Sequence, residues 1–130
     1  MSTGQQIESE IKAKGLTAPR VTPADLKANI ATEHYFTGDQ GVFGAAMDKD
    51  GTSERKQLPH LALLTFCVLT LRNGTKVVGV NYGAIDPAQH DPALGRTEAR
   101  NHAIEQVWPL MGYQLREQLY QMQQPMHHPV

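Results

Sequence analysis

The sequence contains one cysteine and only three serines, and each shortage excludes a class of protein. A lone cysteine cannot form a disulfide within the chain, which favours a reducing, intracellular compartment. Cys67 lies in an apolar strand pattern, which favours an inert thiol over a nucleophile. The serines, Ser2, Ser9 and Ser53, fall in expected loops or termini, so the sequence indicates no Ser/His/Asp triad.

The chain also lacks a long apolar run and an excess of charge of one sign. No segment approaches the roughly 18 consecutive apolar residues of a membrane span, and residues 1–15 lack the apolar core of a signal peptide. Twelve basic and thirteen acidic residues give a net charge of −1, whereas proteins that coat nucleic acids carry a strongly basic face. We therefore expect neither membrane insertion, nor secretion, nor binding to polymeric nucleic acid.

Metal-binding and phosphate-binding motifs are missing too. The six histidines form no HExxH motif and no zinc spacing with the cysteine. Asp48-Lys49-Asp50-Gly51 resembles the start of a calcium loop, but its glycine is misplaced and the later ligands are absent, so a polar turn is favoured. There is no Walker A loop and no GxGxxG. The sequence predicts no metal, no cofactor and no enzyme activity.

The 130 residues suit one domain and are too few for two ordinary ones. The expected fold class is α+β, with an antiparallel hairpin or small sheet packed against several helices. We expect a single domain, 1–130, with four parts. These are an N-terminal helical part (1–36), a long loop (37–59), a hairpin with C-terminal helices (60–122) and a flexible tail (123–130).

Capping signals predict the helices. Thr22 is a good N-cap and Pro23 suits a first helical position, so we expect a helix from there to about His34. A shorter helix is expected within residues 2–15.

A further helix should begin at Asp91-Pro92 for the same reason. Ala99, Ala103 and Val107 recur every four residues in it, as a core-facing stripe should. Pro109 lacks an N–H and is expected to break or kink this helix, with a second segment following at 110–121.

The region from Leu61 to Gly83 predicts a β-hairpin around Asn73-Gly74, the pair that best suits a two-residue type I′ turn. That turn would set Phe66 opposite Asn81, with glycines on either side. Because a shift of one residue exchanges the two faces of a strand, this pairing depends on the register.

Two pairs of residues are candidates for binding. Arg96 and Arg100 are one helical turn apart near a helix start, where their mutual repulsion and the helix dipole both disfavour them. A bound phosphate would offset both penalties; the alternative is that they are ordinary exposed or salt-bridged arginines. Phe66 and Asn81 together suit a base or ribose, and the alternative is a core phenylalanine with a structural asparagine.

The motifs FCVLTLRNGTKVVG, DP and GRTEARNHAIEQVWPLMGYQLREQL resemble, in this order, a family of small phage and prophage proteins. Its best-understood branch is the type 1 Thoeris anti-defence sponges. The resemblance covers Thr65 to Leu119, with weaker similarity over 31–44. The loop 37–59 and the tail depart from the family.

The resemblance implies a non-enzymatic protein in the cytoplasm of the bacterial host. Such sponges bind and sequester cyclic nucleotide immune signals, namely glyco-cyclic ADP-ribose or cyclic oligonucleotides, and form dimers or hexamers with pockets between subunits. By the same resemblance, Arg96 and Arg100 would contact ligand phosphates, and Phe66 and Asn81 would complete the pocket. The alternative is a structural or protein–protein interaction module with no small ligand.

Overall fold

The structure is a computed structural model that describes residues 6, 7, 9, 10, 18–50 and 58–124. The chain divides into two compact units. One comprises residues 30–106, and the other comprises residues 1–29 together with 107–130. The predicted fold class is confirmed, because helices accompany an antiparallel sheet.

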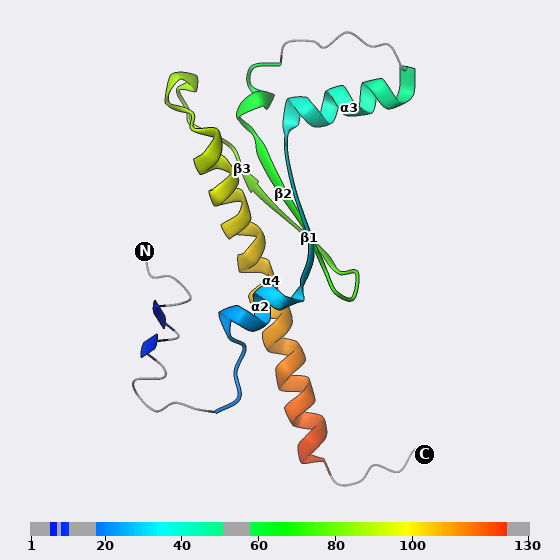
Figure 1. Cartoon of the computed structure of the whole chain (residues 1–130), viewed down its shortest axis with the longest axis vertical. Helices are drawn as coiled ribbons and strands as arrows, with labels where there is room; N and C mark the ends of the chain where they lie inside the picture. The colour runs from blue at the N-terminus through cyan, green and yellow to red at the C-terminus, as the bar shows by residue number, and fades with distance from the viewer. Residues whose placement is uncertain (1–5, 8, 11–17, 51–57, 125–130) are drawn as a thin grey trace. The chain divides into compact units, whose positions relative to one another are not determined.

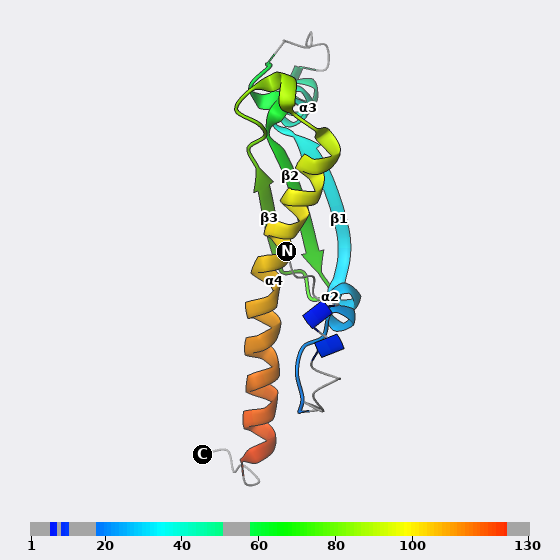
Figure 2. The ribbon, with the colours of Figure 1, turned by 90° about the vertical axis from the view of Figure 1, so that its left-hand side faces the viewer.

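The unit 30–106 is built on a three-stranded antiparallel sheet of order β1-β2-β3, so β2 is central (Figure 1). The N-terminal half of helix α4 runs along one face of this sheet (Figure 2). The strands are β1 (Ile30–Thr37), β2 (Thr65–Leu71) and β3 (Lys76–Asn81). The helices are α3 (Gly38–Asp50), the 3₁₀ turns η1 (Leu61–Leu63) and η2 (Pro87–Gln89), and α4 (Pro92–Gln123), which continues into the other unit.

Gly79 is the point of closest approach between the sheet and α4. A Cβ built on Gly79 would lie 1.9 Å from the carbonyl oxygen of Ala99 and 2.9 Å from the Cβ of Ala103. Both alanines are fully buried, as are Cys67 and Leu69 on β2. Small residues on both elements thus let the helix backbone sit directly on the strand.

The turn between β2 and β3 differs from the prediction. Its loop has three residues, because the N–H of Leu71 donates to the carbonyl of Thr75 (2.8 Å). Within this loop, only Gly74 has a positive φ, at 89°. The side chain of Asn73 accepts from the N–H of Thr75 (3.0 Å), and this local bond fixes Asn73 outside the left-handed region that a type I′ turn requires.

The register is therefore one residue away from the predicted one. Phe66 pairs with Val80, and Asn81 pairs with Thr65, so the predicted Phe66–Asn81 pairing is wrong. The physical reason is the packing of α4. This register turns Gly79 toward the helix, where no Cβ fits, and turns the valines beside it to the opposite face.

Strand β1 and helix α3 were not predicted. β1 lies where the helix to His34 was expected, and α3 occupies much of the expected loop 37–59. Both faces of β1 are partly exposed. The strand therefore lacks the alternation of apolar and polar residues by which a half-buried strand is predicted. α3 begins at Gly38, where the side chain of Gln40 accepts from the N–H of Thr37 (2.9 Å).

The other unit contains α2 (Pro23–Asn29) and the remainder of α4. The predicted cap of α2 is confirmed as a reciprocal pair. The Thr22 N–H donates to the carboxylate of Asp25 (2.9 Å), and the Asp25 N–H donates to the Thr22 hydroxyl (3.1 Å). These bonds hold the pKa of Asp25 below its ordinary value. Leu26 is buried, as expected.

Helix α4 is longer than predicted. Its expected cap is confirmed, since the carboxylate of Asp91 accepts from the N–H groups of Ala93 (3.0 Å) and Leu94 (3.3 Å). The buried stripe is confirmed as well. The expected break at Pro109 is wrong, because α4 continues through it to Gln123. The expected tail and most of the residue 2–15 helix lie outside the described residues, although residues 6, 7, 9 and 10 are helical.

Two side chains of α4 bond to the outer edge of β3. The Nδ1 atom of His102 accepts from the N–H of Val80 (2.9 Å), so this imidazole carries its proton on Nε2. The Gln106 amide donates to the carbonyl of Val78 (2.7 Å). Among the described helices, none combines the length and the apolar character needed to cross a membrane.

Candidate functional site

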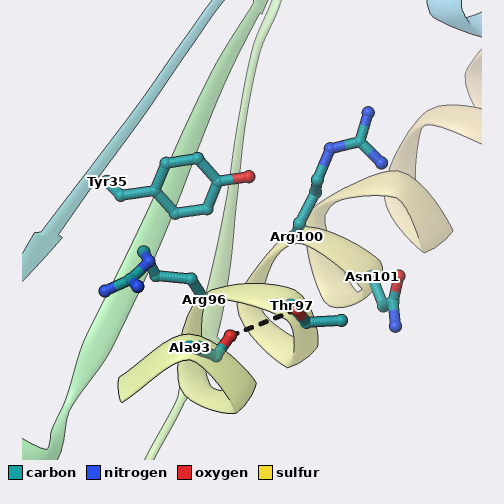
Figure 3. A pocket seen from close by; sticks show the side chains of 6 residues that line it. All are labelled: Tyr35, Ala93, Arg96, Thr97, Arg100 and Asn101. Carbon is teal, nitrogen blue, oxygen red and sulfur yellow. Dashed lines mark hydrogen bonds between the residues drawn. The ribbon is translucent and has the colours of Figure 1, made fainter.

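A cleft lies between strand β1 and the first half of α4, within the unit 30–106. Its volume is about 480 Å³, and it is bounded by one strand residue and five helix residues. Figure 3 shows the ring of Tyr35 reaching from β1 toward the helix. The lining residues are Tyr35, Ala93, Arg96, Thr97, Arg100 and Asn101. Both predicted arginines therefore line one cleft, as their spacing on a helix requires.

The two arginines differ in their partners. The Nε atom of Arg100 lies 2.9 Å from a carboxylate oxygen of Glu33 on β1. Arg96 has no hydrogen bond or ion pair with any residue in the described ranges, and its side chain is exposed. Figure 3 shows the two guanidinium groups pointing to different sides of Tyr35. Arg96 is thus the cation that is ready for an anion, while Arg100 is held by an internal carboxylate.

Tyr35 joins the strand side of the cleft to this ion pair. Its hydroxyl donates to the second carboxylate oxygen of Glu33 (3.0 Å). Burial, followed by that hydrogen bond, raises the pKa of the Tyr35 phenol well above its ordinary value. The phenol is therefore a neutral hydrogen-bond donor at physiological pH.

Tyr35 should ionise above the pH range in which a phenol ordinarily titrates, because its pKa is raised. Because the pKa of Tyr35 is raised in the folded protein, the stabilisation that this neutral phenol contributes is complete below the pKa of the unfolded chain. It is lost as the pH rises through the pKa of the folded protein. Phenolate absorbance against pH should show a late step that is absent in Tyr35→Phe; an unchanged curve would contradict the assignment.

The other two predicted site residues lie elsewhere. Phe66 is on the face of the sheet away from α4, and its ring stacks on that of Phe36 with centroids 5.2 Å apart. Asn81 is on the face toward α4, where its side chain accepts from the N–H of Gly83 (2.9 Å). Neither lines the cleft with the two arginines.

A second cavity, of about 320 Å³, lies beside the cleft and shares Tyr35 and Arg96 with it. Among the described residues there is no cluster of His, Cys, Asp or Glu with the geometry of a metal site. Cys67 is buried and free, and burial raises the pKa of its thiol, in keeping with the predicted inert role.

Sequence reasoning missed Tyr35 and Glu33 because it assigned their segment to a helix. In a strand, residues 33 and 35 share a face, and this face is the one that looks toward α4. The segment ATEHYFT contains threonine and two aromatic residues, which are enriched in strands, and these could have indicated a strand.

Comparison with known proteins gives one family. The family described as phage protein (N4 Gp49/phage Sf6 gene 66) matches over residues 21–119, a range that contains β1, the sheet and the cleft. No curated protein and no solved structure matches the chain.

Proposed function

Because the chain belongs to the phage protein (N4 Gp49/phage Sf6 gene 66) family, we propose that it is an anti-defence protein that sequesters a nucleotide signal. The ligand is a cyclic nucleotide made by the bacterial host, either glyco-cyclic ADP-ribose or a cyclic oligonucleotide. The protein acts in the host cytoplasm as a homo-oligomer, and it binds this ligand without degrading it.

The observation that carries this proposal is that Arg96, which pairs with no described residue, lies beside Arg100 in one cleft. A guanidinium presents a planar fork of donors that matches phosphate oxygens. The phenol of Tyr35, neutral at physiological pH, lies next to these cations, and its oxygen can accept a hydrogen bond while its proton is donated to Glu33. The same wall offers the side chains of Thr97 and Asn101 to ribose hydroxyls.

Sequestration also demands high affinity. Depleting a scarce signal needs a dissociation constant in the nanomolar range, which corresponds to about −12 kcal/mol. Two arginines on an open surface fall short of this, whereas charge-assisted bonds shielded from water are stronger. We therefore propose that a second subunit closes the cleft.

The direct test mixes purified protein with glyco-cyclic ADP-ribose or a cyclic trinucleotide, removes unbound ligand and then denatures the protein. The proposal expects intact ligand in the released fraction. Chemically altered ligand would instead indicate an enzyme. Failure to retain any of these nucleotides would exclude a sponge.

Glu33 is expected to compete with the ligand for Arg100. Removing its charge with Glu33→Gln keeps the size of the side chain and one acceptor oxygen, and it should tighten nucleotide binding by roughly threefold to tenfold, from Coulomb's law at close range in water. Glu98→Gln makes the same change of charge at an exposed position of α4 outside the cleft, and it should have no such effect. Calorimetric titration measures both, and weaker binding by Glu33→Gln would refute the competition.

A second candidate, a protein–protein interaction module, is favoured by the sheet face opposite α4. The stacked rings of Phe36 and Phe66 lie on that face, as does Val78, and Phe36 and Val78 are exposed by 38% and 41%. Exposed apolar area of this kind is typical of interaction surfaces. Absence of nucleotide retention in the test above is the outcome that favours this candidate.

A further inference from the structure

The second cavity differs in chemistry from the cleft beside it. Its walls come from the end of β1, the start of α3, η1, the start of β2, the segment that precedes α4 and the start of α4 itself. No carboxylate lines it, and its single permanently charged lining residue is Arg96, on the wall that it shares with the cleft. A ligand part in this cavity would therefore be uncharged, with a charged part next to Arg96.

Thr65 places a hydroxyl group at the cavity wall. It is the one buried polar residue of the described ranges, with 3% of its surface exposed. Its side chain lines the cavity, and its hydroxyl has no hydrogen-bonding partner among the described residues. The hydroxyl is therefore open to the cavity and free to bond a ligand there.

Two more side chains offer polar atoms at this cavity. The imidazole of His90 is half-buried and bonds to no described residue, so it can donate and accept. The Gln40 side-chain oxygen is occupied by the N–H of Thr37 (2.9 Å), which leaves its amide N–H groups to donate. Phe36 and Pro92 supply apolar surface.

We propose that this second cavity is the subsite for the nucleoside portion of a nucleotide whose phosphate contacts Arg96. A nucleoside is uncharged, carries hydroxyl and ring-nitrogen atoms for Thr65, His90 and Gln40, and has a flat apolar ring. The cavity volume of about 320 Å³ lies at the lower end of the range for ligand sites, about 300–1,000 Å³, as expected for one part of a ligand. This inference rests on the proposed function, since it takes the arginine-lined cleft as the phosphate site.

Filling the cavity should remove the nucleoside contribution alone. Ala62 lines it from η1, so Ala62→Phe places a ring inside it and leaves both arginines in place. With ADP and inorganic pyrophosphate as probes in calorimetric titrations, we expect the wild-type protein to bind ADP tighter by roughly tenfold or more, the equivalent of two net hydrogen bonds. In Ala62→Phe, affinity for ADP should fall to that for pyrophosphate, and affinity for pyrophosphate should not change.

Ala88→Phe is the matched control, because Ala88 is an exposed residue of η2 outside the cavity. Thr65→Val is a second variant that keeps the shape of the side chain and removes the hydroxyl. It should weaken ADP binding severalfold without lowering the melting temperature, since no bond within the protein is lost. This variant keeps the test decisive if Ala62→Phe does not fold.

The outcomes separate the two proposals. Unchanged ADP affinity in Thr65→Val and in folded Ala62→Phe would overturn the nucleoside subsite and leave the phosphate site intact. Equal wild-type affinities for ADP and pyrophosphate would also overturn it. If the wild-type protein bound neither probe, the arginine-lined cleft would not be a phosphate site, and the proposed function would fail with it.

Discussion

Replacing Arg96 and Arg100 together with alanine should abolish nucleotide retention. Each charge-assisted hydrogen bond contributes about 1.5–3 kcal/mol, so losing both lowers affinity by a factor on the order of 10² to 10⁴. Arg96→Ala alone should have the larger single effect, because Arg100 must first exchange the Glu33 carboxylate for the ligand. The measurement is ligand retention followed by release on denaturation.

The fold should survive this double replacement. The ion pair that is lost involves side chains exposed by about a third, and such pairs contribute little to stability. Replacing Arg72 and Arg116, two exposed arginines outside the cleft, changes the net charge equally and should leave retention unchanged. Normal retention by the Arg96/Arg100 variant would show that the ligand binds elsewhere.

Gly79→Ala should be the most damaging single substitution in the sheet. A Cβ at this position would lie 1.9 Å from the Ala99 carbonyl oxygen and 2.5 Å from the Ala103 backbone nitrogen. Since both atoms belong to the backbone of α4, the helix itself would have to move. Overpacking of this kind costs about 3 kcal/mol, and chemical denaturation should show a free energy of unfolding lowered by at least that amount.

Gly112→Ala provides the contrasting substitution. A Cβ on this glycine of α4 would meet no heavy atom within 4 Å outside its own helix backbone. Alanine is the better helix former by about 1 kcal/mol, so this variant should be as stable as the wild-type protein or slightly more so. If Gly79→Ala were equally well tolerated, the close packing of α4 on β3 would be incorrect.

Local signals in the sequence predicted several elements correctly. Each of these elements depends on residues within one or two helical turns, and such short-range interactions can be predicted from a single sequence. They are the N-caps at Thr22 and Asp91 and the buried alanine stripe of α4. The predicted break at Pro109 was wrong, since α4 continues through this residue.

The hairpin register and the site depended on longer-range contacts. Asn73-Gly74 suits two turn types, and the choice between them is set by where Gly79 meets α4, a contact between residues distant in sequence. Phe66 and Asn81 were paired by the wrong register, so they separated to opposite faces. Arg96 and Arg100 were placed correctly together because helical spacing alone decides which side they share.

The contacts of His102 and Gln106 with β3 bear on how this chain behaves at high concentration. A sheet edge with unpaired backbone groups is a template on which another chain can add a strand and begin to aggregate. Here the N–H of Val80 and the carbonyl of Val78 are already bonded to side chains of α4. The helix that carries the arginines thus also covers these two backbone groups of the edge, which disfavours the joining of sheet to sheet along β3.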